Sequence, residues 1–342
     1  MRLFPSLMGE GLGERRRTTS STSTVLRRRA AGLYTGLLGL CGVLVVSSAV
    51  AQSSPKPFLG RWDLTLTNSL GTLPSWIDVS ENLGQVKVLF VGVTDHATPM
   101  KQVELKDGEL VFVSPANEEG FPVNTTYAVK RIGDRLTGQV TNSEHKWILT
   151  GHRAPALTYH AVTDWGKPIR LFDGKNFDGW RFKDPAHAGS WKIEDDELVS
   201  TGHGTEIITM QKFRNYKLHL EFNCGMKSNS GVFLRGRYEV QIETDSVSEP
   251  PSHHTGGVYG FLDPTPEQPR VANTWQTFDI TLIGRTVTVV QNGITVIDHK
   301  QIDGITGGAL DSNEGQPGPI YLQGSEEGRV AFRNIVLTPA KE

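Results

Sequence analysis

Short runs of alternating apolar and polar residues recur from Phe58 to Leu337, and this period of two constrains the fold more than any other feature of the sequence. Successive side chains of a β-strand point to opposite faces, so such runs predict half-buried strands. Residues 62–66, 85–91 and 126–130 are examples, and no helical stripe competes with them. The chain has 37 glycines, which suits many tight turns between short strands. The sequence therefore predicts an all-β protein.

The strand pattern divides the 342-residue chain into two halves. Residues 58–156 predict a small antiparallel β-barrel domain, and residues 169–340 predict a larger two-sheet sandwich. A proline-containing linker, residues 157–168, joins them, and we expect the two β-domains to fold separately. Within the second half, Asn292-Gly293 permits the positive φ angles of a type I′ turn and predicts a hairpin.

The first strand of the N-terminal half carries a weaker pattern. Its opening residues, Gly60-Arg61-Trp62, resemble the Gly-x-Trp start of lipocalin-like barrels. A buried tryptophan that closes one end of any small barrel would account for the same residues equally well.

The first 51 residues have the pattern of an export signal. Two arginine clusters precede an apolar run at residues 33–50, which ends in the small-x-small cleavage pattern Ala49-Val50-Ala51. The alternative is a membrane anchor, but glycines and serines interrupt the run and no positive cluster follows it. A Ser/Pro linker follows at residues 52–57. We therefore expect an exported protein, periplasmic or extracellular, with no stable membrane anchor after cleavage near Ala51; N-terminal sequencing of the exported protein tests this.

The overall charge excludes one class of partner. The net charge of −2 leaves no electrostatic footprint for nucleic acid. The two cysteines are Cys41, within the predicted signal, and Cys224, so no intrachain disulfide is expected in the mature protein and Cys224 is interpreted as a packing residue. The sequence does not predict the oligomeric state.

Strand parity selects candidate functional residues in the second half. Glu221 lies on the polar face of its predicted strand, and Glu239 and Gln241 share one face of another. Arg235 ends a predicted strand that is flanked by glycines, and the alternation places its side chain on the same face as that of Phe233. If these strands are neighbours, they form one patch of carboxylates, an arginine and an amide. The alternative is the solvated polar face that every sandwich sheet has.

Several short motifs follow one another in order through about half of the chain. They are FDGKNFDGW at 172–180, LEF at 220–222, SNSGVFLR at 228–235, YEVQI at 238–242, TGGVY at 255–259, WQTFDI at 275–280, NG at 292–293, PIYLQ at 319–323 and FRNI at 332–335. Together they resemble the 3-keto-disaccharide hydrolase family, also described as 3-keto-glucoside 1,2-lyase and 3-keto-2-hydroxyglucal hydratase. The resemblance implies a concanavalin-like jelly-roll β-sandwich and an exported bacterial enzyme of carbohydrate metabolism.

The resemblance also implies a reaction, the cleavage of 3-keto-glycosides. A ketone at C3 acidifies the C2 proton, so a base can form an enolate that expels the C1 oxygen, and water then adds. Such a site needs a positioned base and acid, and donors for the enolate oxygen. The resemblance implies that Glu221 and Glu239 are the carboxylates, either of them the base, that Arg235 is the donor, and that Gln241 and Asn229 orient hydroxyls. In an alternative role, Glu221 only holds Arg235 in an ion pair.

Other residues are expected to contact the sugar. These candidates for substrate binding are Asn229, His254, Tyr259, Trp275 and Gln323. One departure from the family follows Gln323: the family usually carries Asp-His or a similar pair there, where this chain has GSEE at 324–327. The competing hypothesis is a non-catalytic, lectin-like carbohydrate-binding protein. Burial of the aromatic side chains would favour the enzyme, whereas an exposed row would favour the lectin; the side chains in question are Trp180, Trp191, Tyr238, Tyr259 and Trp275.

The sequence predicts no metal among the catalytic residues. His253 and His254 are adjacent on a predicted loop, and neighbouring side chains of an extended backbone point to opposite sides. The oxygens of Asp311, Asn313 and Glu314 could bind calcium, but they lack the spacing of an EF-hand. A loop held by Asx-turns is the alternative.

Overall fold

The computed structural model describes most of the chain after the predicted export signal. The described residues are 54–94, 96–118, 120–202, 204–244, 248–325 and 327–341. The predicted signal at residues 1–51 lies outside them, so export and cleavage near Ala51 stay predictions. Within the described part of the chain, no helix is long and apolar enough to cross a membrane.

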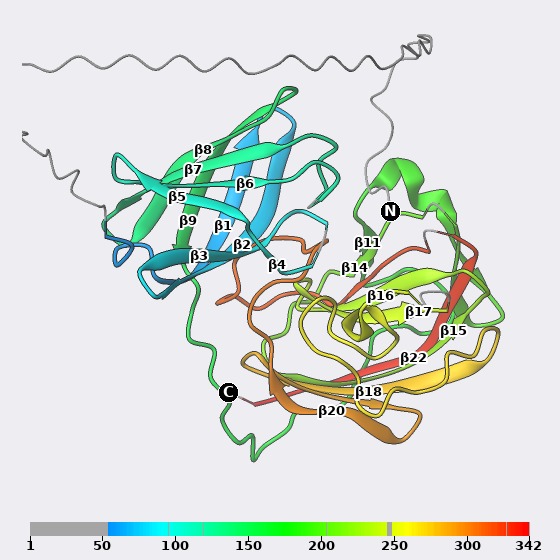
Figure 1. The fold of residues 1–342 in the computed structure, drawn as a ribbon. Helices are drawn as coiled ribbons and strands as arrows, with labels where there is room; N and C mark the ends of the chain where they lie inside the picture. The colour runs from blue at the N-terminus through cyan, green and yellow to red at the C-terminus, as the bar shows by residue number, and fades with distance from the viewer. Residues whose placement is uncertain are drawn as a thin grey trace, which may run out of the picture. The chain divides into compact units, whose positions relative to one another are not determined.

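The N-terminal half is a single nine-stranded antiparallel sheet, here called the barrel (Figure 1). Its strand order is β4-β3-β2-β1-β9-β8-β7-β6-β5, and β3 also contacts β5, so the sheet curls until its ends meet. The strands are β1 (Gly60–Asn68), β2 (Gly71–Asn82), β3 (Gln85–Val91), β4 (Thr98–Pro99), β5 (Gln102–Lys106), β6 (Glu109–Ser114), β7 (Thr125–Ile132), β8 (Arg135–Thr141) and β9 (Lys146–Arg153).

Alternate residues of β1 fill the barrel. Trp62, Leu64 and Leu66 are fully buried in its core. The Arg153 guanidinium lies 3.7 Å from the centroid of the Trp62 ring, and the indole Nε1 donates to the Phe58 carbonyl at 2.7 Å. The tryptophan is therefore a core residue of the barrel, with the Arg153 cation stacked on its ring.

The C-terminal half forms two antiparallel sheets, here called the sandwich (Figure 1). The larger sheet has the order β12-β13-β22-β15-β18-β19-β20, with β10 paired to β22. Its strands are β10 (Ile169–Arg170), β12 (Trp191–Glu194), β13 (Glu197–Thr201), β15 (Tyr216–Cys224), β18 (Trp275–Ile283), β19 (Thr286–Gln291), β20 (Ile294–Gln301) and β22 (Arg329–Pro339).

The smaller sheet of the sandwich has the order β11-β14-β21-β16-β17. Its strands are β11 (Trp180–Phe182), β14 (Ile207–Thr209), β16 (Asn229–Leu234), β17 (Tyr238–Glu243) and β21 (Tyr321–Leu322). Two short 3-10 helices, η1 (Pro185–Ser190) and η2 (Pro251–His253), lie in the connections.

The core lies between the two sheets of the sandwich. It contains the inward residues of β15 and β17: Leu218, Leu220, Phe222, Tyr238, Val240 and Ile242. The predicted hairpin is present, because β19 pairs with β20 and both turn residues, Asn292 and Gly293, have positive φ angles of 50° and 78°. The predicted fold class, an all-β chain with a barrel before a jelly-roll-like sandwich, is confirmed.

The outer face of β1 and β2 packs against the sandwich, and the chain from Ser53 onward is one compact unit. Trp76, on β2, is fully buried in the sandwich core and meets the Phe261 ring edge-on at 5.9 Å. A Cβ atom on Gly304 would lie 2.4 Å from the Trp76 ring, so only glycine fits there. Independent folding of the barrel and the sandwich stays a prediction.

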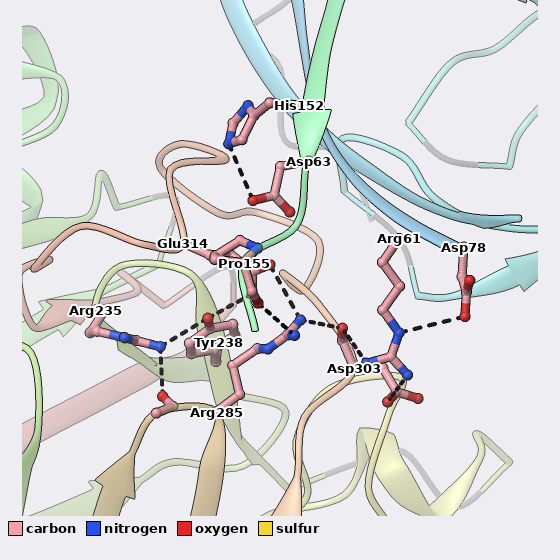
Figure 2. Close-up of polar contacts among 11 residues, drawn as sticks. Arg61, Asp63, Asp78, His152, Pro155, Arg235, Tyr238, Arg285, Asp303 and Glu314 are labelled. Atoms are coloured by element: carbon pink, nitrogen blue, oxygen red, sulfur yellow. Dashed lines mark hydrogen bonds and ion pairs between the residues drawn. The ribbon is translucent and has the colours of Figure 1, made fainter. Parts of the chain in front are cut away.

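A buried polar network continues this junction (Figure 2). Asp63, on the outer face of β1, and Glu314, on the sandwich, are both fully buried. The Tyr238 hydroxyl donates to Glu314 Oε1 at 2.6 Å, and Arg285 Nη1 lies 3.4 Å from Glu314 Oε2. Burial and, after it, the charge of Glu314 raise the pKa of Asp63 to about 9, so this carboxyl group is protonated at neutral pH.

Candidate active site

The outer face of β17 carries a row of polar side chains. Glu239, Gln241 and Glu243 alternate with the core residues of this strand, as parity predicts, and each is at least nine-tenths buried. Gly231, on the neighbouring strand β16, pairs with Gln241. A Cβ atom at Gly231 would lie 2.1 Å from Glu239 Oε1. The glycine therefore makes the space in which the Glu239 carboxyl group lies.

The chain after β17 returns along the edge of the same strand. The Tyr259 backbone N–H donates to the Glu239 carbonyl at 3.1 Å, and the Gly256 N–H donates to the Gln241 carbonyl at 3.0 Å. The Gln241 N–H donates in turn to the Gly257 carbonyl at 3.0 Å. These bonds hold the segment containing His253 and His254 beside the polar face of β17.

His253 is the most constrained titratable side chain of this segment. Two prolines with a restricted φ precede it: Pro250 is the N-cap of η2, and Pro251 begins η2, which ends at His253. Its Nδ1 atom lies 2.8 Å from Glu249 Oε2, and its ring stacks on Tyr259 at 4.2 Å between centroids. Among the described residues its Nε2 atom has no hydrogen-bond partner, although the residue is only 4% exposed.

His254 belongs to a separate chain of charges. Its Nδ1 atom lies 2.9 Å from Glu267 Oε1, and Arg270 bridges from Glu267 at 3.7 Å to Glu243 Oε1 at 3.1 Å. The adjacent histidines therefore face different carboxylates. Within the described residues, no group of three or more His, Cys, Asp or Glu side chains is placed to hold a metal ion.

The structure does not place Arg235 with Glu239, contrary to the parity prediction. Arg235 lies in the turn between β16 and β17 with a φ angle of 53°, and this positive φ breaks the alternation of the strand. Its Nη2 atom donates to the Tyr238 hydroxyl at 3.0 Å and to the Gly284 carbonyl at 2.8 Å. Arg235 is thus part of the buried network at the barrel junction (Figure 2). Phe233 packs elsewhere, with Ile208 and Tyr321.

Glu221 and Trp275 are also separated from the β17 face. Both lie on the larger sheet, because β15 pairs with β18 and β22 and not with the strands of the smaller sheet. Glu221 does point away from the core as predicted, but its partner is Arg333, at 2.7 Å, not Arg235. The Arg333 guanidinium also stacks on the Trp275 ring at 3.8 Å. These side chains form a surface cluster on the opposite side of the sandwich.

The remaining substrate-binding candidates lie close to the β17 face. Asn229, on β16, pairs with Glu243, and Gln323 follows β21 and donates from its backbone to the Gly231 carbonyl at 2.9 Å. Tyr259 packs on His253. Of the five aromatic side chains named as the discriminator, Trp180, Trp191 and Tyr238 are buried in the sandwich core and Tyr259 is buried beside His253, whereas Trp275 is partly exposed. They do not form the exposed row expected for the lectin.

The predicted calcium loop uses its oxygens for other partners. Asp311 Oδ1 accepts from Arg237 Nε at 2.8 Å and from the Asn313 backbone N–H at 2.8 Å, which is an Asx-turn. Glu314 accepts from Tyr238 and faces Arg285. Calcium binding by this loop stays a prediction.

Sequence reasoning passed over His253 in favour of His254. The available signal was the spacing Glu249 to His253, which brings a carboxylate to an imidazole four residues later if one helical turn intervenes. The consecutive prolines supply that turn. A second ring, that of His96, also contacts His253. His96 is far away in the sequence, so no local pattern predicts this contact.

The comparisons with known proteins concern the sandwich. A family model described as a 3-keto-alpha-glucoside-1,2-lyase-like domain matches residues 167–338. The 3-keto-disaccharide hydrolase of Bacteroides thetaiotaomicron is 31% identical over 94 residues, which make up 24% of this chain and 32% of that protein. The chain thus spans about a third of the length of this curated relative.

Two solved structures resemble the same half of the chain. A candidate glycosyl hydrolase from Parabacteroides distasonis is 25% identical, with 53% of this chain and 94% of that chain covered and a TM-score of 0.42. The β-glucanase of Bacillus licheniformis is 14% identical, with 52% of this chain and 100% of that chain covered and a TM-score of 0.34.

Proposed function

The chain belongs to the 3-keto-alpha-glucoside-1,2-lyase-like family, and from this premise we propose that it is an enzyme that cleaves 3-keto-glycosides by elimination at C1 followed by hydration. The observation that carries the proposal is His253, whose ring is held by Glu249 and Tyr259 with Nε2 left without a partner among the described residues. A carboxylate on Nδ1 fixes the tautomer that leaves Nε2 able to accept a proton.

The proposed reaction begins with removal of the acidic C2 proton by His253 Nε2. The electron pair of the C2–H bond forms the enolate, and its collapse breaks the bond between C1 and the glycosidic oxygen. We assign Glu239 as the acid that protonates this oxygen, since its carboxyl group lies on the adjoining polar face. Water then adds across the double bond, so the net change is hydrolysis.

Gln241 supplies a positioned donor in this scheme. Its Oε1 atom accepts from the Ile242 backbone N–H at 3.0 Å, which orients the amide and leaves its NH₂ group to donate to a sugar oxygen. This role replaces the one that parity assigned to Arg235.

The proposal is tested by incubating the protein with 3-keto-trehalose, 3-keto-sucrose and the corresponding unoxidised sugars. We expect release of the aglycone sugar from the keto forms alone, identified by mass spectrometry. In deuterated water, substrate recovered before completion should carry deuterium at C2. Binding of these sugars without turnover would instead support the lectin-like alternative, with the altered segment after Gln323 as the first explanation.

Gly231→Ala is expected to lower turnover while the protein stays folded. The added Cβ would lie 2.1 Å from Glu239 Oε1, so the carboxyl group must move, and a displacement of about 1 Å can cost about 10²-fold in rate. The φ angle of Gly231 is not positive, so alanine suits the backbone. The measurement is kcat together with thermal unfolding.

Gly189→Ala is the matched control for this variant. A Cβ atom at Gly189 meets nothing within 4 Å, and its φ angle is also not positive. Both should leave circular dichroism unchanged, but only Gly231→Ala should slow the reaction. An unchanged kcat in a folded Gly231→Ala protein would show that the position of Glu239 does not matter.

A further inference from the structure

A loop of the barrel reaches the candidate active site of the sandwich. It follows β3, and both the end of β3 and the loop are anchored on the sandwich: Val91, the last residue of β3, is fully buried in the sandwich core, and the Gly308 backbone N–H donates to the Val93 carbonyl at 2.9 Å. Five residues beyond Val91, His96 lies beside the segment that carries His253.

The approach of His96 depends on a glycine of the sandwich. A Cβ atom on Gly260 would lie 2.3 Å from the Cβ atom of His96, and Gly260 has a φ angle of 71°. A side chain at this position would push the barrel loop away and would strain the backbone. The glycine therefore seats the barrel loop directly against the segment containing His253 and Tyr259.

The imidazole of His96 meets that of His253 at 4.9 Å between centroids, with an angle of 66° between the rings. Tyr259 stacks on the same His253 ring at 4.2 Å and 25°. Glu249, which holds Nδ1, is half exposed and joined by a single contact. A half-exposed pairing with a carboxylate restrains the His253 ring only weakly. An edge-on ring and a stacked ring together restrict rotation about both bonds of the His253 side chain.

We propose that His96 is a positioning residue for the His253–Glu249 pair, so that the barrel forms one wall of the active site of the sandwich. This inference rests on the proposed function, in which His253 Nε2 removes the C2 proton. His96 itself exchanges no proton with the substrate. It restrains the orientation of the His253 ring, which carries the proposed base Nε2, and it thereby gives the N-terminal half of the chain a part in the reaction.

The test compares variants of the full chain. His96→Ala should lower kcat about 10-fold or more with little change in KM, because misorientation of a base affects the transition state more than substrate binding. His96→Phe keeps an aromatic ring without a titratable nitrogen and should restore most of kcat. Gly260→Ala should reproduce the His96→Ala defect by displacing the loop. His145→Ala, which removes an exposed histidine from the β8–β9 turn of the barrel, should leave kcat unchanged.

A second readout does not depend on activity. Ring resonances of His253 in histidine-labelled protein, assigned by their loss in His253→Ala, should shift in His96→Ala and Gly260→Ala but not in His145→Ala. Unchanged resonances and an unchanged kcat in His96→Ala would overturn the proposal. Failure of His96→Phe to restore kcat would also overturn it, because the nitrogen and not the ring would then be required. Absence of any keto-glycoside turnover in the wild type, with the resonance shift present, would contradict the proposed function and leave the contact itself supported.

Discussion

His253→Ala is expected to lower turnover of a 3-keto-glycoside about 10²–10⁴-fold, the usual contribution of a positioned general base. Among the described residues of the segment after β17, His253 alone has an imidazole that is both stacked on an aromatic ring and paired with a carboxylate through Nδ1. Its loss removes the group proposed to take the C2 proton, so exchange of that proton with deuterated water should fall in parallel. The measurements are kcat and the rate of C2 deuteration.

Two comparisons separate chemistry from packing in this experiment. Glu249→Gln keeps a partner for Nδ1 but removes the charge, so it should reduce kcat less than His253→Ala does. His187→Ala, at the exposed helix η1, removes another histidine that is paired with a carboxylate and should leave kcat unchanged. A normal rate of C2 deuteration in His253→Ala would show that another group is the base.

Stability is expected to fall as pH rises from about 5 to 9, because of the carboxyl group of Asp63. Its pKa is raised to about 9 in the folded protein, from an ordinary value of 3.8, first by burial and then by the charge of Glu314. Between these two values the folded state holds a proton that the unfolded state has lost. The contribution is therefore complete below the unfolded pKa and is lost as pH rises through the folded pKa, with a slope of up to about 1.4 kcal/mol per pH unit.

Asp63→Asn should flatten this dependence. Asparagine resembles the protonated carboxyl group in shape and stays neutral throughout the range, so the variant should gain stability relative to the wild type as pH rises. The measurement is urea unfolding at several pH values from 5 to 9. Asp78→Asn is the matched control, because Asp78 lies on the same outer face of the neighbouring strand but is partly exposed. Equal pH slopes in wild type and Asp63→Asn would contradict the assignment.

Local sequence was sufficient for much of the fold. The alternation of apolar and polar residues correctly predicted which side chains of β15 and β17 face the core. The Asn292-Gly293 pair predicted the β19–β20 hairpin, because the positive φ angles of the turn involve those two residues alone. Alternation could not say which strands are neighbours. That choice depends on contacts between segments far apart in the chain, and it separated Glu221 from Glu239.

The candidate site was predictable only in part, for the same reason. The shared face of Glu239 and Gln241 follows from the period of one strand. Arg235 was misplaced because one positive φ angle in a turn reverses the direction of a side chain, and arginine gives no sign of it in the sequence. His253 contacts Glu249 and Tyr259 from its own segment and His96 from the barrel. Only the folded chain brings these four residues together.

The use of both faces of β1 restricts how this protein can diverge. From Trp62 to Leu66 one set of side chains fills the barrel, while Asp63 and Thr65 meet the sandwich. In β7, by contrast, buried residues such as Tyr127 and Val129 alternate with less buried ones. Neutral drift can therefore proceed at the less buried positions of β7, whereas Trp62, Asp63 and Leu64 of β1 follow one another and are all fully buried. An insertion of one residue in β1 would exchange its two faces, so the two halves of the chain must evolve as a matched pair at this strand.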